Sequence, residues 1–272
     1  MADKLRREIA RLKTKPKLVI IQIGDLAESN TYIRNKKAFA EKIGVTTLHQ
    51  RYPASTSEAR VIADIKKYNK DTSVHGVMMQ LPGPKGFDTE RVLEAIDPKK
   101  DVDGLTALNT KHLFDNHPAF VPATAKGIIT LLDRYKVKLT GTTVTIVGHS
   151  SLVGKPALLA FLNRGATVTI CHKDTKHLEQ ETKRAQILVS AVGKPKLITK
   201  NHVSKGQIVV DIGITVLKSG KVVGDVDFVP VSKIVKAITP VPGGVGPMTI
   251  VSLFENLLFG LRTRTLSNRS RN

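Results

Sequence analysis

The sequence predicts an α/β protein of two α/β domains, the second a Rossmann-type doubly wound sheet, with a cleft between them. Short β-branched runs alternate with stretches of helical period, and this alternation restarts after Pro122. The length, 272 residues, is enough for two ordinary domains. Alternating strands and helices are typical of parallel sheets covered by helices, because a parallel connection must cross the sheet.

The first half contains three candidate strands separated by candidate helices. Strands are predicted at 17–24, 45–53 and 75–82, and helices at about 29–43, 57–68 and 89–96. Before them, Leu5, Ile9 and Leu12 fall on one helical face, which predicts a surface helix that ends before Pro16.

The second half repeats the pattern with more strands. Strands are predicted at 143–148, 167–172, 186–193, 207–214 and 236–242, helices at about 126–135, from 156 and at about 247–261, and a tight turn at 218–221. By pattern alone the last helix fits either domain. We place one domain at 1–121 with 247–264, the other at 122–246, and a basic, disordered tail at 265–272.

The charge balance points to anionic partners. The chain has 43 Lys and Arg against 23 Asp and Glu, a net charge of +20. Nucleic acid, an acidic membrane or phosphorylated and carboxylated small molecules would all fit. The absence of Trp and the presence of only four Tyr disfavour nucleic acid, since stacking needs aromatic rings. A single cysteine and no apolar run of about 20 residues predict a cytoplasmic protein without a membrane span.

The segment TVTIVGHSSLVGKP at 143–156 predicts a phosphate-binding loop between a strand and a helix. Gly148 suits the tight turn, and Gly154 suits close packing of the helix on the sheet. The helix N-terminus would offer free N–H groups to phosphate. However, Ser150 stands where a Rossmann motif has its middle glycine, and a plain α/β connection is the commoner explanation of such a joint.

The end of the next strand bears on the choice of nucleotide. It reads Cys171-His172-Lys173-Asp174, where an NAD site usually has a carboxylate. A cation at this point favours NADP through its 2′-phosphate, whereas Asp174 leaves NAD possible.

Four features of the first domain and the last loop are candidates for catalysis. Tyr32 and Lys36 lie one helical turn apart, and Gln80 ends a buried strand. Asp101 and Asp103 precede a glycine, and ITPVPGGVGPMT at 238–249 predicts a rigid loop that runs into a helix. Each has an ordinary alternative: a solvated helix face, a polar strand end, an Asx turn and a structural turn.

In this order, these segments resemble the bifunctional methylenetetrahydrofolate dehydrogenase/cyclohydrolase (FolD) family from about Lys17 to Leu257. The most specific matches are GDLAESNTYIRNK, VHGVMMQLP, DPKKDVDGL, VGHSSLVGKP, ATVTICHKDT, ILVSAVGKP, VVGDVDF and ITPVPGGVGPMT. The resemblance implies a folate-binding catalytic domain, an NAD(P)-binding domain, tetrahydrofolate substrates, NADP, no metal and a homodimer.

For the folate site, the resemblance implies that Lys36 is the catalytic lysine, Tyr32 packs beside the folate ring and Gln80 hydrogen-bonds the lysine. Asp103 would anchor the amino group of the pterin. Further substrate-binding residues would be Leu81, Pro242, Gly243 and Gly244. A lysine with a pKa near 10.4 is a poor base, so we expect burial and the neighbouring Lys37 to lower the pKa of Lys36.

For the cofactor site, the resemblance implies binding residues at Gly148, His149, Ser150, Lys173, Ile214 and Thr124. The family usually has arginine where this chain has His149, and Pro-Cys-Thr-Pro where this chain has Pro122-Ala123-Thr124-Ala125. Alternatives are a monofunctional dehydrogenase of the same family, another two-domain dehydrogenase such as the shikimate type, and a degenerate scaffold that binds nucleic acid.

Overall fold

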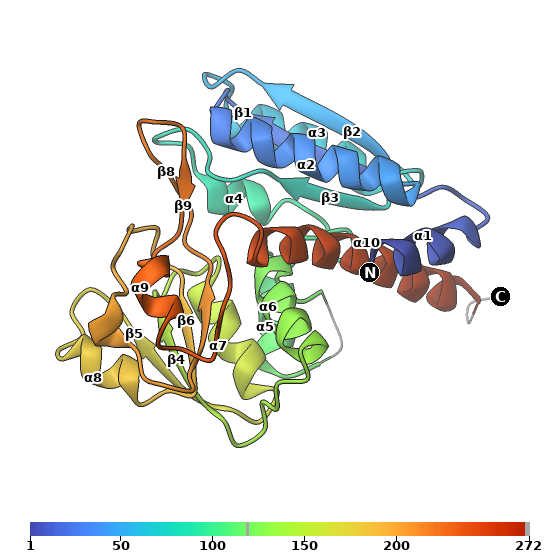
Figure 1. Cartoon of the computed structure of the whole chain (residues 1–272). Coiled ribbons are helices and arrows are strands. Elements are labelled where there is room, and N and C mark those ends of the chain that lie inside the picture. Colours follow the sequence, from blue (N-terminus) through green and yellow to red (C-terminus); the bar gives the residue numbers. More distant parts are fainter. Residues whose placement is uncertain (118–119, 270–272) are drawn as a thin grey trace. The chain divides into compact units, whose positions relative to one another are not determined.

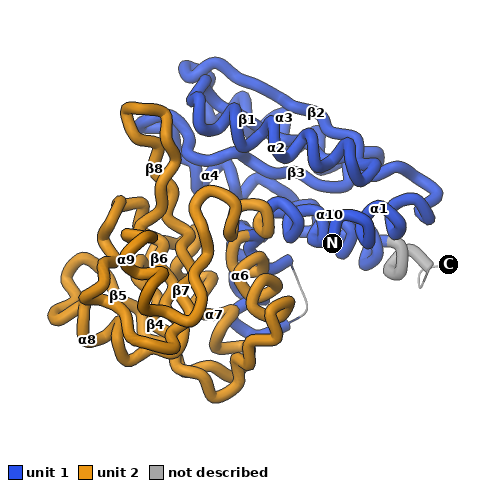
Figure 2. Tube along the Cα trace, in the orientation of Figure 1, with its two compact units in different colours: residues 1–123, 250–272 blue, residues 124–249 orange. Residues whose placement is uncertain are grey.

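The chain divides into two compact units. The computed structural model describes residues 1–117 and 120–269, and the side chains of 265–269 are outside this description. Unit 1 comprises residues 1–123 and 250–272, and unit 2 comprises residues 124–249 (Figure 2). The sequence predicts these boundaries at 121/122 and 246/247. Each unit has its own parallel sheet, and each is described by itself below.

Unit 1 is built on a parallel sheet with strand order β2-β1-β3 (Figure 1). The strands are β1 (Lys17–Ile23), β2 (Thr46–Tyr52) and β3 (Gly76–Met79). The helices are α1 (Ala2–Ala10), α2 (Ala27–Ile43), α3 (Glu58–Lys70), α4 (Thr89–Leu93), α5 (Ala107–Phe114) and most of α10 (Val245–Arg269). The three strands predicted in the first half are confirmed.

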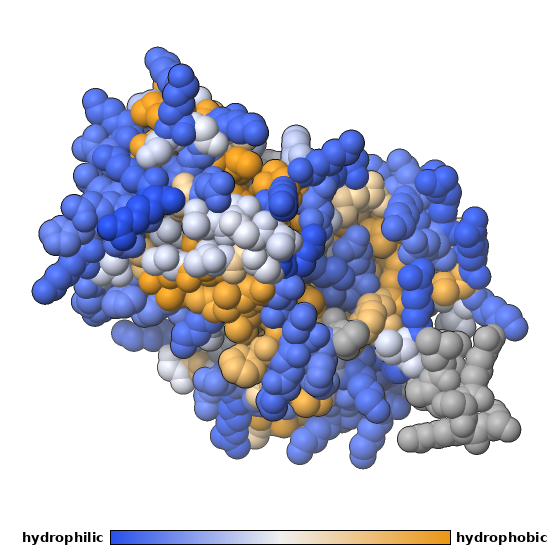
Figure 3. All heavy atoms as spheres, turned by 90° about the horizontal axis from the view of Figure 1, so that it is seen from below, coloured by the Kyte–Doolittle hydropathy of each residue, from blue (hydrophilic) through white to orange (hydrophobic). Residues whose placement is uncertain are grey.

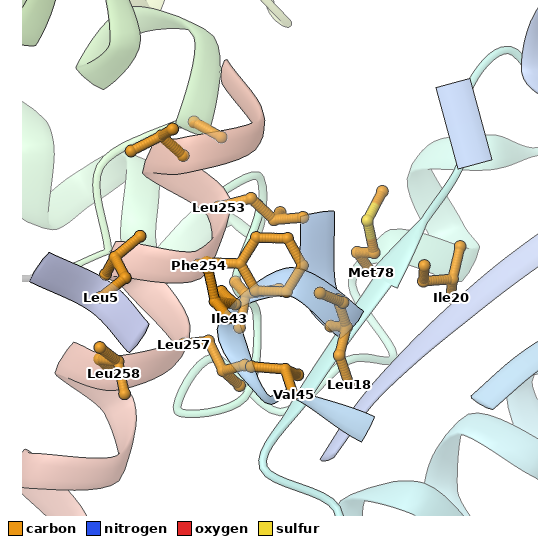
Figure 4. Close-up of a cluster of buried hydrophobic side chains, with 14 of the residues drawn as sticks. Leu5, Leu18, Ile20, Ile43, Val45, Met78, Leu253, Phe254, Leu257 and Leu258 are labelled. Carbon is orange, nitrogen blue, oxygen red and sulfur yellow. The ribbon is translucent and has the colours of Figure 1, made fainter. Parts of the chain in front are cut away.

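Alternate residues of the unit 1 strands face two different apolar clusters, as a period of two requires. Leu18, Ile20 and Met78 pack with residues of α2 and α10, and Figure 4 shows several of these side chains around Phe254. Val19 and Val77 belong to a second cluster, which includes residues of α3 and α4. Burial on both faces explains the continuous apolar runs of β1 and β3.

Unit 2 is a five-stranded parallel sheet with the order β10-β7-β6-β4-β5. The strands are β4 (Thr143–Val147), β5 (Thr167–Cys171), β6 (Ile187–Ser190), β7 (Ile208–Asp211) and β10 (Ala237–Ile238). Counted from β4, this is the doubly wound order 2-1-3-4-5, whose switch point lies between β4 and β6. The predicted doubly wound sheet is therefore confirmed, in this variant of the strand order.

The remaining elements of unit 2 are short, apart from the helix that opens it. They are α6 (Ala123–Arg134), α7 (Gly154–Leu162), α8 (Leu178–Lys183), η1 (Lys200–His202) and α9 (Phe228–Ser232). The predicted turn at 218–221 joins the antiparallel strands β8 (Thr215–Val216) and β9 (Val222–Val223).

The C-terminal helix continues past the predicted end at 261, to Arg269. The Arg264 guanidinium donates to the carbonyl oxygens of Lys99 at 2.8 Å and His75 at 2.6 Å. Arg262 forms an ion pair with Glu8 at 3.0 Å. These arginines therefore tie the helix to unit 1. Of the expected basic tail, 265–269 is helical, and 270–272 lies outside the described residues.

Hydrophilic side chains surround smaller apolar areas on the face seen in Figure 3. Among the described residues, no helix combines the length and the apolar character that a membrane span needs.

Candidate active site

Polar side chains of unit 1 gather at the carboxyl ends of β1 and β3. In the strand order β2-β1-β3 these two strands flank the switch point, where open α/β sheets place ligands. Gln80 follows β3 directly, and its N–H donates to the carbonyl oxygen of Ile21 in β1 at 2.8 Å. Helix α2 follows β1 after a short turn and carries Tyr32 and Lys36.

Lys36 is held by the side chain of Gln80. Its position matches the spacing of the buried face of α2, so only 8% of the residue is exposed. The Lys36 Nζ donates to Gln80 Oε1 at 2.7 Å. The Gln80 Nε2 donates to the carbonyl oxygen of Leu81 at 2.9 Å, which orients the amide so that its oxygen faces the amine.

Burial lowers the pKa of Lys36, because an ammonium group loses its hydration, while the charge of Asp103 opposes this shift. The prediction that Lys37 contributes is wrong. Lys37 is exposed, and its charge instead adds to the effect of burial, which lowers the pKa of His49. Burial therefore favours the neutral amine of Lys36, and its hydrogen-bond partner, the Gln80 amide, carries no charge that would stabilise the ammonium form.

The two aspartates of the loop at 101–104 have different surroundings. Asp101 is fully buried and accepts from the N–H groups of Gly104 at 2.9 Å and Thr106 at 2.8 Å, and from Asn109 Nδ2 at 3.0 Å. Asp101 therefore stabilises the conformation of the loop, which is the structural role expected of an aspartate in an Asx turn. Burial raises the pKa of Asp103 to about 6, against the opposing charge of Lys36 and with a further rise from Asp101.

Tyr32 lies one turn before Lys36 and is half-buried. Burial and the charge of Glu28 raise the pKa of its phenol. The hydroxyl therefore stays protonated at neutral pH and cannot serve as a base there.

A polar network that the sequence analysis missed fixes the start of α2. The fully buried Gln22 donates from Nε2 to Asn30 Oδ1 at 2.7 Å, and its Oε1 lies 2.8 Å from His49 Nε2. Asn30 Nδ2 donates to Asp25 at 2.7 Å, and Asp25 pairs with Arg51. A glutamine near the end of an apolar strand was the available signal. The network anchors the helix that carries both candidate catalytic side chains.

The loop after β4 leaves no room for a Cβ at its two glycines, which agrees with the tight turn predicted at Gly148 and the close packing predicted at Gly154. A Cβ on Gly148, whose φ is +111°, would lie 2.3 Å from the carbonyl oxygen of Ala191. A Cβ on Gly154 would lie 2.0 Å from the carbonyl oxygen of Gly148. Ser150 Oγ accepts from the N–H groups of Val153 at 3.2 Å and Gly154 at 3.4 Å, so it stabilises the start of α7.

Groups able to carry positive charge gather at the ends of β4 and β5. The rings of His149 and His172 stack with their centroids 5.0 Å apart and an angle of 22° between their planes. Lys173 and Asp174 are exposed, and His172 Nδ1 lies 3.7 Å from Asp174 Oδ2. His172 was not among the predicted binding residues, because only the fold brings its ring to His149.

Five further predicted residues all belong to unit 2. Thr124 lies in the first turn of α6 and is half-buried, and Ile214, after β7, is 40% exposed. Pro242, Gly243 and Gly244 precede α10 within unit 2. Their predicted place beside the folate, whose other candidate residues belong to unit 1, stays a prediction. The described residues contain no group of three or more His, Cys, Asp and Glu side chains that could hold a metal ion.

Two doubly wound α/β units, one with a glycine loop shaped for a nucleotide and one with a buried lysine–glutamine pair, define a nucleotide-dependent two-domain enzyme as the class. Family models match residues 1–103 as "Tetrahydrofolate dehydrogenase/cyclohydrolase, catalytic domain" and 122–265 as its NAD(P)-binding domain. The chain belongs to the tetrahydrofolate dehydrogenase/cyclohydrolase family.

Curated relatives and solved structures agree with this family. The chain is 45% identical to "Bifunctional protein FolD" of Nautilia profundicola over 257 residues, covering 93% of this chain and 90% of that protein. The bifunctional FolD structure from Campylobacter jejuni has a TM-score of 0.94 at 39% identity, covering 97% of this chain and 95% of that chain. FolD of Trypanosoma brucei, complexed with NADP cofactor and inhibitor, has a TM-score of 0.92 at 31% identity, with 97% and 94% covered.

A shikimate dehydrogenase from Peptoclostridium difficile is similar in fold alone, with a TM-score of 0.56 at 13% identity over 90% of this chain and 91% of that chain. The shikimate-type alternative thus lacks the sequence identity that the FolD proteins have.

Proposed function

We propose that this chain oxidises 5,10-methylenetetrahydrofolate to 5,10-methenyltetrahydrofolate with NADP, and hydrolyses that product to 10-formyltetrahydrofolate. The observation that carries the proposal is the buried Lys36–Gln80 pair, joined at 2.7 Å, in a chain of this family. A dehydrogenase alone has no need of a buried amine held ready for proton transfer.

The cofactor half of the proposal rests on the loop after β4. Its glycines leave a cradle that a Cβ would fill, next to the N-terminus of α7, which suits a pyrophosphate. When bound, NADP accepts a hydride from the one-carbon bridge of the substrate. Binding residues are Gly148, His149, Ser150, Lys173, Ile214 and Thr124, with His149 and Lys173 at the 2′-phosphate.

The hydrolytic half of the proposal rests on residues of unit 1. The neutral amine of Lys36 takes a proton from the attacking water, and Gln80 orients that amine. Asp103 binds the amino group of the pterin, and the neutral phenol of Tyr32 packs beside the ring. Further folate contacts come from Leu81, Pro242, Gly243 and Gly244.

The direct test is to supply purified protein with methylenetetrahydrofolate and either NADP or NAD, following reduced nucleotide and formyl product. We expect oxidation with NADP, weaker oxidation with NAD, and no lasting methenyl absorbance. If the methenyl compound accumulates and then disappears only at the rate of its uncatalysed hydrolysis, the monofunctional alternative is supported. Failure to oxidise the substrate with either nucleotide would refute the proposal.

Asp103→Asn is expected to weaken folate binding and stabilise the protein. The pKa of Asp103 is about 6 in the folded state against an ordinary 3.8, so the folded state binds this proton more tightly. The ionised carboxylate therefore destabilises the fold increasingly as the pH rises from about 4 to about 6. Since one pKa unit corresponds to about 1.4 kcal/mol, we expect a gain of roughly 1–3 kcal/mol at pH 7.5 after allowance for solvent.

Chemical denaturation of Asp103→Asn and wild type at pH 4 and 7.5 measures this gain. An equal stability difference at both pH values would contradict the assignment of the destabilisation to Asp103.

His149→Arg is expected to lower the KM for NADP by about 5- to 10-fold at pH 7.5, a change worth roughly 1 kcal/mol. Arginine is always charged and matches a phosphate with two hydrogen bonds, which the ring of a histidine cannot form. The KM for NAD, which lacks the 2′-phosphate, is the internal control and should change less than two-fold. An equal change for both nucleotides would place His149 away from the 2′-phosphate.

Two further expectations rest on the family resemblance alone. We propose a homodimer, for which light scattering of the purified protein is the test, and a cytoplasmic location, which cell fractionation would test.

A further inference from the structure

Unit 2 contains two buried aspartates that the proposed function does not use. Asp225 follows β9 and has no exposed surface, and Asp211 ends β7 and is 4% exposed. Buried carboxylates are costly unless they are fully hydrogen-bonded. The groups that bind them come from three separate loops.

Asp225 binds the loop that follows β6. Its Oδ2 accepts from Ser190 Oγ at 2.9 Å and from the N–H of Val192 at 2.7 Å. Its Oδ1 accepts from the N–H of Lys194 at 2.7 Å. One carboxylate thus fixes the backbone at 190–194, and Ala191 of this loop is the residue that lies against Gly148 of the cofactor loop.

Asp211 binds the segment that carries Asp225. Its Oδ1 accepts from the N–H groups of Gly213 and Asp225, both at 3.0 Å, and its Oδ2 accepts from the N–H of Val226 at 2.9 Å. Its own N–H donates to Thr239 Oγ1 at 2.8 Å. Asp211 therefore links the end of β7 to the segment that precedes the Pro/Gly loop.

Glycines make this arrangement close-packed. A Cβ on Gly213 would lie 2.1 Å from the Asp225 carboxyl carbon, and a Cβ on Gly224 would lie 2.0 Å from Asp211 Oδ2. Burial, with the charge of Asp225, raises the pKa of Asp211 to about 6, while its backbone hydrogen bonds oppose the rise. Burying two carboxyl groups next to each other costs stability, and such a cost is typical of functional sites, where the exact position of groups matters more than stability.

We propose that Asp225, held by Asp211, is a positioning residue for hydride transfer. Asp225 fixes the loop at 190–194 and thereby sets the position of Ala191 behind Gly148. Asp211 accepts from the N–H of Gly213, which packs against the Asp225 carboxyl, and the two aspartates together set the position of Ile214 beside the nicotinamide. This inference rests on the proposed function, because it assigns the nicotinamide to Ile214. It implies that the carboxylate affects oxidation and leaves the hydrolysis carried by Lys36 unchanged.

The test compares Asp225→Asn with Asp227→Asn, a matched change two residues away. Asp227 is partly exposed and forms an ion pair with the exposed Lys196 at 3.5 Å. In Asp225→Asn an NH₂ group must face a backbone N–H. We expect the kcat of oxidation to fall about 10- to 100-fold, since small misplacements of reacting groups have effects of this size. Hydrolysis of added methenyltetrahydrofolate should change less than two-fold.

Further readouts separate positioning from folding. With substrate deuterated at the one-carbon bridge, the isotope effect on kcat should be larger in Asp225→Asn than in wild type, because the hydride step becomes slower. Ser190→Ala removes one hydrogen bond from the same carboxylate, and should lower the kcat of oxidation about 3- to 10-fold even if Asp225→Asn fails to fold.

Three results are decisive against the inference. If the wild type oxidises methylenetetrahydrofolate but Asp225→Asn and Asp227→Asn have equal kinetics, the inference is overturned and the proposed function stands. The inference is also overturned if Asp225→Asn and Ser190→Ala lose oxidation and hydrolysis together, in proportion to the fraction of unfolded protein. A wild type without NADP-dependent oxidation would overturn the proposed function, and the inference with it.

Discussion

Lys36→Met is expected to reduce hydrolysis of methenyltetrahydrofolate by at least about 100-fold while oxidation with NADP persists. Methionine fills a similar volume beside Gln80 but has no group that can move a proton. General acid–base catalysis contributes about 10²- to 10⁴-fold, and the whole of that contribution should be lost. The NADP-binding candidates belong to unit 2, so the affinity for NADP should change less than two-fold.

The matched control is Lys37→Met, since Lys37 is the exposed neighbour of Lys36 on α2. It makes the same substitution at an exposed position and should keep hydrolysis within about two-fold of wild type. Methenyl absorbance with excess substrate measures the hydrolysis, and fluorescence titration measures NADP binding. Full ring opening by Lys36→Met would refute the role of Lys36 as the base.

The identity of the partner explains why Lys36 can act as a base at all. Burial favours the neutral amine, and the oxygen of Gln80 orients the amine without adding a negative charge. A carboxylate at position 80 would stabilise the ammonium and oppose the effect of burial. The charge of Asp103 opposes it already, and the raised pKa of Asp103 limits this opposition as the pH falls towards 6.

Most of the fold follows from local patterns. The strands at 17–23, 143–147 and 208–211 have apolar runs that are buried on both faces, and the helices between them have amphipathic spacing. Helix α5 was missed because Leu108 and Phe114 are exposed and give no apolar stripe. Helix α8 was missed because its sequence, LEQETK, is almost entirely polar.

Less of the candidate site could be predicted. Gln80 could be predicted from its position at a strand end and from the family resemblance. The local pattern does not choose between Asp101 and Asp103, because that choice depends on which of the two carboxylates accepts hydrogen bonds from the loop backbone. Gln22, His172 and Asp225 gained their interest from partners distant in sequence, at Asn30, His149 and Ser190. Such pairs are set by the order of strands in the sheet, which a local pattern does not contain.

Gly154→Ala is expected to abolish NADP-dependent oxidation and to destabilise unit 2. The added Cβ would lie 2.0 Å from the Gly148 carbonyl oxygen, 2.7 Å from the Gly148 carbonyl carbon and 2.9 Å from His149 Cα. All three are backbone atoms of the loop itself, so no flexible side chain can move aside. The start of α7 must shift away from β4, which opens the cradle and should lower kcat/KM for NADP by at least about 100-fold.

The control is Gly206→Ala, a glycine of the same unit before β7. Its φ is +86° and nothing lies within 4 Å of the added Cβ, so it introduces backbone strain without a clash. We expect Gly206→Ala to lose about 1–2 kcal/mol of stability and to keep oxidation within two-fold. Gly154→Ala should lose about 1–3 kcal/mol from the clash and nearly all oxidation. Because Lys36 belongs to unit 1, hydrolysis of methenyltetrahydrofolate should persist in both variants wherever thermal unfolding shows unit 1 to be folded. NADP titration completes the comparison: wild-type affinity in Gly154→Ala would mean that the loop after β4 does not hold the pyrophosphate.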